Sequence, residues 1–113
     1  MRIDSYSFGR IVINGTNYTS DVIIYPGRVD GSWWRTEGHR LRIEDLDEAL
    51  KVKPEVLIIG TGYSGVMTVP KEVIEQLARL GIKVKVGRTG KAVKEYNDLQ
   101  ATKTVVAALH LTC

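Results

Sequence analysis

Apolar residues follow two different periods in the second half of the chain. Residues 56–59 form a continuous apolar run, which is typical of a strand covered on both faces. Between Pro70 and Gly81 the apolar residues recur at three- and four-residue spacing, which predicts a helix with Pro70 in its first turn and Gly81 just beyond its end. Residues 82–86 alternate apolar residues with lysines, as a strand with one wet face or near a sheet edge does. The three segments predict a βαβ unit with parallel strands and a right-handed crossover.

The first third of the chain carries shorter apolar stretches that predict antiparallel strands. Residues 8–13 and 16–19 flank an Asn-Gly pair, which is a strong signal for a two-residue hairpin turn. Residues 21–25 form a further short strand that a Pro-Gly pair ends. Both tryptophans follow within residues 32–35, where we expect a short strand or an extended segment.

Two further helices and a final strand complete the pattern. Residues 43–51 place apolar residues at helical spacing and acids in the first turns, where the helix dipole favours them. A third helix begins near Thr89 and runs to Leu99, and residues 104–112 have the composition of a buried strand. The chain is therefore predicted to be a single α/β domain over residues 1–113, long enough for one hydrophobic core.

The composition is that of an ordinary soluble domain. Apolar residues make up 43% of the chain and charged residues 26%. No apolar run approaches the roughly 20 residues that span a bilayer, and the segment MRIDSYSFGR lacks the apolar stretch of a signal peptide. We therefore expect a cytoplasmic protein. The single cysteine, Cys113, excludes an internal disulfide and a cysteine-rich metal site within one chain, and we predict no cofactor.

The net charge of +3 is unevenly distributed along the chain. Residues 1–56 contain eight basic and nine acidic residues, whereas residues 57–113 contain eight and four. Six cations lie from Arg79 to Lys94 with no acid among them. Such a run fits an anion or nucleic-acid surface or, more simply, a solvated face with a lysine-protected sheet edge. No aromatic residue stands within the run, which disfavours base stacking, so we prefer the solvated face and do not expect a nucleic-acid partner.

Residues 60–65, GTGYSG, match the G-x-G-x-x-G pattern of dinucleotide-binding loops. The surroundings do not fit that function, because Pro70 starts the helix about five residues too late and no acid follows at the end of the next strand. The chain is also too short for a second nucleotide-binding half. A weaker hypothesis remains, in which loop amides and residues after the next strand bind a small anion. Its members are Gly60, Thr61, Gly62, Arg88 and Thr89. The alternative is a structural loop whose glycines permit a tight exit from the strand.

The other reactive side chains form no recognisable catalytic or metal-binding set. His110 and Cys113 are three residues apart and would face opposite sides of a strand, so we expect a packed histidine and an inert thiol rather than a base and its nucleophile. His39 lies in a polar loop. Two histidines and one cysteine provide few ligands for a transition-metal ion, and we expect no metal.

The two tryptophans are adjacent, so in an extended segment they face opposite ways. One of them can lie in the core, while the other is covered by a loop, a ligand or a partner, or stays exposed. An exposed tryptophan beside an arginine would resemble the hot spot of a protein interface. The candidate partner-binding residues are therefore Trp33, Trp34 and Arg35.

Several of these segments together resemble one known family. The matching segments are SYSFGRIVINGTNYTSDVII near the N-terminus, then VLIIGTG and PKEVIEQLARLGIKVKV, and finally YNDL and VVAALHLTC. Over essentially its whole length it resembles the Mth-domain family, and it is similar in size to a prokaryotic stand-alone member. The resemblance implies a three-layer α/β domain whose mixed central sheet contains the βαβ unit, with a small antiparallel β-subdomain from the N-terminal third. Eukaryotic members of that family act as assembly or regulatory factors, and the family offers no catalytic residues to carry over.

These observations favour a non-enzymatic binding or assembly module with a protein partner, which a second copy of the chain could also provide. The alternative is a small-anion or metabolite-binding protein, or an enzyme, that uses the 60–65 loop and Arg88. The two hypotheses differ in whether that loop borders an open cleft.

Ending on a buried strand should make the C-terminus indispensable for folding. We expect deletion of residues 105–113 to unfold the domain, because it removes a strand predicted to be covered on both faces. Circular dichroism of the truncated protein checks this. A soluble truncation with the spectrum of the full chain would contradict it.

Overall fold

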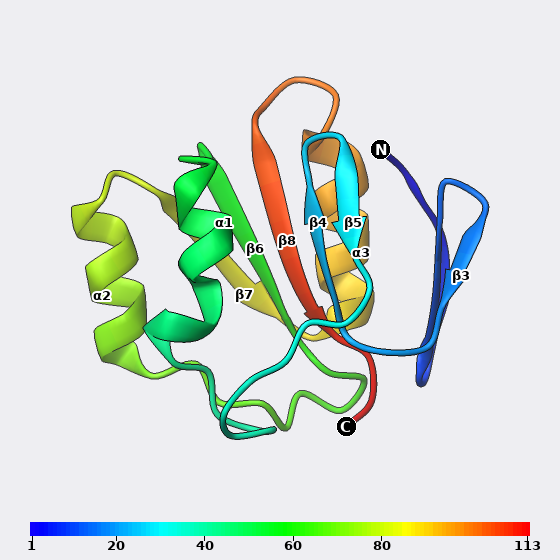
Figure 1. Ribbon diagram of the computed structural model, residues 1–113, viewed down its shortest axis with the longest axis horizontal. Helices are drawn as coiled ribbons and strands as arrows, with labels where there is room; N and C mark the ends of the chain where they lie inside the picture. The colour runs from blue at the N-terminus through cyan, green and yellow to red at the C-terminus, as the bar shows by residue number, and fades with distance from the viewer.

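A computed structural model describes all residues from Met1 to Cys113. The chain folds around a mixed five-stranded sheet. The strands follow the spatial order β5-β4-β8-β6-β7, and a separate three-stranded sheet has the order β1-β2-β3 (Figure 1). The strands are β1 (Ile3–Ser7), β2 (Arg10–Ile13), β3 (Thr16–Tyr18), β4 (Val22–Tyr25), β5 (Arg28–Asp30), β6 (Val56–Thr61), β7 (Lys83–Gly87) and β8 (Val105–His110). The helices are α1 (Asp47–Lys51), which follows a 3₁₀ turn (Ile43–Leu46), α2 (Lys71–Arg79) and α3 (Thr89–Leu99).

The predicted βαβ unit is confirmed. Strand β6 pairs in parallel with β7 on one side and with β8 on the other, and α2 connects β6 to β7. Every residue of β6 and β8 is buried, as the continuous apolar runs of these segments predict. Strand β7 lies at the sheet edge, and this position explains its alternation of apolar residues with lysines.

Alternating side chains of the central strands enter two separate cores. On one face, Leu57 and Val106 pack with Leu77 of α2 and with the α1 segment. On the other face, Ile58 and Ala107 pack with α3 and with the apolar residues of the small sheet. The molecule therefore has three layers, with α1 and α2 on one side of the central sheet and α3 with the β1–β3 sheet on the other. The three-layer fold with an antiparallel β-subdomain, as the family resemblance implies, is thus observed.

The hairpin predicted from the Asn-Gly pair joins β2 to β3. Asn14 and Gly15 have φ angles of 47° and 78°, the left-handed conformations that this kind of turn requires. The first strand, β1, was not predicted, because its segment IDSYS is mostly polar and exposed. Its position comes instead from antiparallel pairing with β2.

Three local features were not predicted as they are observed. The short strand β5 was not predicted, whereas residues 32–35, expected as a short strand or an extended segment, contain no strand. The helix expected over residues 43–51 starts as a 3₁₀ turn before it becomes α-helical. Pro70 is the residue that caps α2 rather than a member of its first turn. Each difference lies at the end of an element or in a very short one, where local sequence preference is weakest.

Candidate functional site

The predicted anion-site residues do come together at the carboxyl ends of the parallel strands. The Gly62 amide donates to Thr89 Oγ1 at 2.9 Å, and the Thr89 amide donates to the Gly62 carbonyl at 3.1 Å. The Thr61 hydroxyl donates to the Gly87 carbonyl at 3.1 Å. Gly60 lies so close to Thr89 that an added Cβ would stand 2.8 Å from its Oγ1. These contacts fasten the glycine loop to the start of α3.

Amides of the glycine loop (residues 60–65) and of the residue just after it are bonded to the C-terminal tail. Tyr63 donates to the Thr112 carbonyl at 2.7 Å, and Val66 donates to the Cys113 carbonyl at 2.9 Å. Gly62 has a φ of 109°, and a side chain there would collide with the backbone of the last two residues. The C-terminal tail therefore covers the loop and occupies amides that an anion would need.

Arg88 is the one member of this set with a free charged group. Its side chain is exposed, lies against Gly65 and forms no ion pair. Thr89, in contrast, is fully buried and donates its hydroxyl to the His110 carbonyl at 2.6 Å. A small anion site at Gly60, Thr61, Gly62, Arg88 and Thr89 stays a prediction. In this conformation Arg88 would contribute most of it.

The two tryptophans separate as expected, one inside and one outside. Trp33 is buried and its indole Nε1 donates to the Asp45 carbonyl at 3.0 Å. Trp34 is 75% exposed, the largest exposed fraction among the exposed large hydrophobic residues. Arg35 is buried and stacks over the Trp33 ring at 4.5 Å. Of the three candidate partner-binding residues, only Trp34 offers its side chain to a partner.

Trp34 borders a hollow of about 370 Å³ with an acidic rim. The hollow lies between the β4–β5 hairpin and the α1 segment. Its apolar floor is formed by Ile23, Tyr25 and Trp33. Its carboxylates are Asp30, Glu44, Asp45, Asp47 and Glu48.

Carboxylates of this hollow affect the pKa of Tyr25, one of the residues that line it. Burial raises the pKa of Tyr25, and the carboxylates of Asp30 and Glu48 add to that effect against the opposing charge of Arg28. The Arg28 guanidinium stacks over the Tyr25 ring at 4.0 Å. The same edge of the protein therefore already holds one cation against an aromatic ring.

Asp21, Arg35 and His110 form a buried polar cluster between β4, β8 and the segment after Trp34, which the sequence did not predict. Asp21 Oδ2 is 2.8 Å from Arg35 Nη2 and 2.8 Å from His110 Nδ1. Asp21 Oδ1 accepts from the Leu111 amide at 2.7 Å, and Arg35 also donates to the Gly38 carbonyl at 2.8 Å. The cluster residues are far apart in sequence, so no local motif could have indicated them. The prediction of a packed His110 is confirmed.

The cluster holds its carboxyl group ionised. Burial alone would raise the pKa of Asp21, but the hydrogen bonds from His110, Leu111 and Arg35 outweigh it and lower the pKa below the usual value. A carboxylate on Nδ1 orients an imidazole as in a general-base pair. Here, however, His110 Nε2 is buried without a hydrogen-bond partner, and His110 lines none of the hollows. The centroid of the exposed His39 ring lies 5.5 Å from the centroid of the His110 ring. The arrangement ties the C-terminal strand to the segment carrying the tryptophans.

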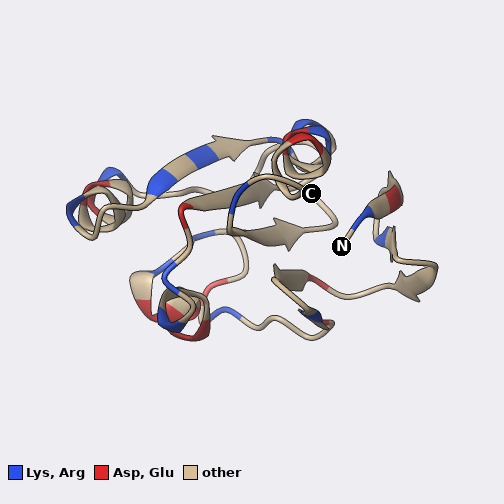
Figure 2. Cartoon of the chain, turned by 90° about the horizontal axis from the view of Figure 1, so that it is seen from above, with Lys and Arg blue, Asp and Glu red and all other residues tan.

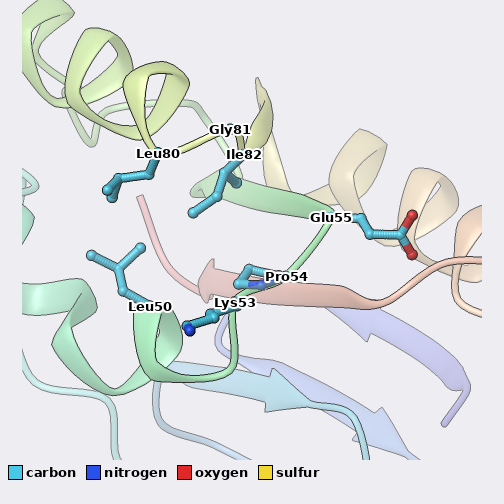
Figure 3. Close-up of a pocket in the computed structure, with 7 residues that line it drawn as sticks. All are labelled: Leu50, Lys53, Pro54, Glu55, Leu80, Gly81 and Ile82. Atoms are coloured by element: carbon cyan, nitrogen blue, oxygen red, sulfur yellow. The ribbon is translucent and has the colours of Figure 1, made fainter.

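A second hollow of about 480 Å³, with Glu55 as its one acidic residue, lies at the amino ends of β6 and β7, away from the glycine loop. Leu50 from α1 and Leu80 from the end of α2 project toward it, whereas Glu55 extends away from them (Figure 3). Glu55 Oε1 accepts from the Thr104 amide at 2.9 Å. Lys53 supplies the only cation of the lining. None of the residues predicted for function lies here.

Two structural findings bear on metal and membrane sites. No group of three or more His, Cys, Asp and Glu side chains is placed to hold a metal ion. None of the helices has the length and apolar character needed to cross a bilayer.

Comparison with known proteins gives one family and several similar structures. The model of a family described as "Protein of unknown function (DUF498/DUF598)" matches residues 3–110. The chain is 30% identical over 101 residues to a "13 kDa major membrane protein" of Francisella tularensis, covering 83% of this chain and 76% of that protein. The crystal structure of the conserved hypothetical protein PH1505 from Pyrococcus horikoshii superposes with a TM-score of 0.85 at 28% identity, over all of both chains. A structure named MT938 gives a TM-score of 0.83 at 29% identity, over 99% of this chain and 98% of that one.

Asp21→Asn tests the buried cluster. Because the folded-state pKa of Asp21 lies below its unfolded value, the ionised carboxylate stabilises the fold above about pH 4 and loses this effect as the pH falls through the folded-state pKa. Leaving Arg35 buried without its counter-ion should cost about 3 kcal/mol near neutral pH. The variant should also lose less stability on acidification than the wild type does.

Urea denaturation near neutral pH and at about pH 3 measures both effects. Asp98→Asn, at an exposed position on α3, is the matched control and should behave as the wild type. An Asp21→Asn variant with wild-type stability at both pH values would contradict a stabilising role for the cluster.

Proposed function

The chain belongs to the DUF498/DUF598 family of proteins of unknown function, which confirms the Mth-domain resemblance, and within this family we propose that it is a non-enzymatic binding module for a basic segment of a partner protein. The observation that supports this most is Trp34, a large aromatic side chain that is 75% exposed at an acid-rimmed hollow. Exposed tryptophans of this kind are enriched at the energetic centres of protein interfaces.

The hollow has the chemistry to receive lysine or arginine side chains. Trp34 offers an aromatic face, on which a cation is attracted by the ring quadrupole. Glu44 and Asp47 carry carboxylates without an intramolecular ion pair, whereas Glu48 is partly engaged by Lys51 at 2.9 Å. The unpaired carboxylates would steer a cationic partner toward the hollow.

Trp33 supplies the rigidity that such a site needs. Its hydrogen bond to the Asp45 carbonyl and the stacking of Arg35 on its ring fix the floor of the hollow. Arg35 is in turn held by Asp21 and Gly38. Arg35 therefore positions the tryptophans rather than contacts the partner, whereas Trp33 forms part of the floor of the hollow. A preformed site loses little conformational entropy on binding.

The alternative function, a small-anion or metabolite-binding protein that uses the glycine loop, has narrower support. Arg88 is exposed and unpaired, but the amides of Gly62, Tyr63 and Val66 already have partners. An anion at that place would gain one charged contact and little else. A protein partner on the Trp34 side is for this reason the preferred proposal, and a cytoplasmic location remains our expectation.

Calorimetric titration of the protein with an oligolysine peptide at low salt tests the proposal. We expect saturable binding that weakens as salt is added. Trp34→Ala should lower the affinity by about 2 kcal/mol, roughly thirtyfold. The double variant Glu44→Gln with Asp47→Asn should weaken binding and reduce its salt dependence.

The matched control is the double variant Glu72→Gln with Glu75→Gln on α2, which removes the same charge from exposed positions that do not line this hollow. It should bind the peptide as the wild type does. The proposal fails if oligolysine does not bind, or if the Trp34 variant and the α2 control lose affinity equally.

A further inference from the structure

Three aromatic rings gather where the β1–β2 turn meets the glycine loop. We call Tyr6, Phe8 and Tyr63 the aromatic patch. The Phe8 and Tyr63 rings meet edge to face with centroids 5.9 Å apart, and the Tyr6 and Tyr63 centroids are 6.4 Å apart. Phe8 is 55% exposed and Tyr63 is 56% exposed. Phe8 and Tyr63, two of the six exposed large hydrophobic side chains of the protein, therefore lie next to each other.

The backbone holds these rings in position. The Gly9 amide donates to the Leu111 carbonyl at 2.9 Å, the Tyr6 hydroxyl donates to the same carbonyl at 2.8 Å, and the Tyr63 amide is bonded to Thr112. The turn, the loop and the C-terminus accordingly lie together at one end of the molecule, at the bottom of Figure 1. The rings form a rigid surface because both segments that carry them are fastened to the same strand end.

A row of cations begins beside the aromatic patch. Arg88 stands next to Thr89, whose amide and hydroxyl are bonded to the residue preceding Tyr63. Arg88, Lys91 and Lys94 recur every third residue, so they lie along one side of α3. All three are exposed and none forms an ion pair, whereas Glu95 on the same helix is engaged by Lys85 at 3.3 Å. Figure 2 shows these basic segments on α3 next to those of β7.

We propose that the aromatic patch and the cations of α3 bind single-stranded nucleic acid. Exposed aromatic rings stack on bases of any sequence, and a row of lysine and arginine side chains follows the phosphate backbone. The proposal goes beyond the binding of a basic partner, and it uses a different surface from the Trp34 hollow.

The shape of the surface favours a strand over a single nucleotide. None of the hollows of the protein is lined by Tyr6, Phe8, Tyr63 or Arg88. A small ligand needs a concave site that surrounds most of it, whereas a strand can bind a flat surface through several stacked bases and phosphates.

No aromatic residue lies between Arg79 and Lys94 in the sequence, but stacking depends on which residues are close in the folded protein. In the folded protein Phe8 and Tyr63 come from 80 and 25 positions before Arg88, and the fold brings them to the start of the basic helix. An apolar protein surface over the same patch would leave the α3 cations without counter-charges. The phosphates of a single strand would supply them.

Fluorescence anisotropy of a labelled oligothymidylate at low salt tests this inference. We expect saturable binding whose logarithmic association constant falls linearly with the logarithm of salt concentration. Tyr63→Ala should lower the affinity roughly tenfold, while Tyr63→Phe, which keeps an aromatic ring, should retain it. Arg88→Ala should weaken binding and reduce the salt slope by about 0.7.

Lys103→Ala is the matched control, because Lys103 is exposed in the turn before β8, at the other end of the parallel strands. It should leave both affinity and salt slope unchanged. Thermal unfolding followed by circular dichroism verifies that each variant is folded. The inference is overturned if oligothymidylate does not bind, or if a duplex of the same length binds equally well. It is also overturned if folded Tyr63→Ala binds as the wild type, or if sedimentation shows a dimer that Tyr63→Ala dissociates.

Discussion

The carbonyl groups of the last three residues hold together segments from across the chain. Leu111 accepts from Gly9 and Tyr6, Thr112 accepts from Tyr63, and Cys113 accepts from Val66. The β1–β2 turn and the glycine loop both depend on this short tail, which itself continues the central strand β8. Since β8 lies between β4 and β6, the tail is fixed by the most buried part of the sheet. The aromatic patch formed by Tyr6, Phe8 and Tyr63 takes its shape from this arrangement.

The same constraint explains the glycine loop. The pattern G-x-G-x-x-G describes a loop whose amides are free to face a phosphate. In this protein the tail occupies the place of that phosphate, and the carbonyls of Thr112 and Cys113 accept the hydrogen bonds. Gly62 needs its positive φ and its missing Cβ because backbone, rather than ligand, lies against it. In this conformation the motif packs against the tail, while Arg88 beside it is exposed to solvent.

Local patterns predicted the main strands and helices, the family resemblance implied their three layers, and the site depends on contacts that no local pattern contains. The period of the apolar residues gave β6, α2, β7, α3 and β8, because a buried strand and an amphipathic helix each leave a repeating signal. Alternation predicted that one tryptophan could lie in the core, but it did not say which one, nor that the other would be exposed as Trp34 is. Asp21, Arg35 and His110 could not be joined in this way, since they meet only after β4 and β8 pair. The grouping of Phe8 with Tyr63 depends likewise on where the C-terminal tail passes. The burial of Arg35, predicted as a partner-contacting residue, follows from the same cluster.

Amide hydrogen exchange of Tyr63 and Val66, followed by NMR, tests the central claim that the C-terminal tail closes the glycine loop. If the backbone oxygens of Thr112 and Cys113 hold these amides, both should exchange more slowly than unprotected loop amides, because exchange requires the C-terminal tail to detach. The interior amides of β8, such as that of Ala107, give the reference for a protected site. Exchange of Tyr63 and Val66 at the rate of an unprotected loop, with Ala107 still protected, would contradict this account.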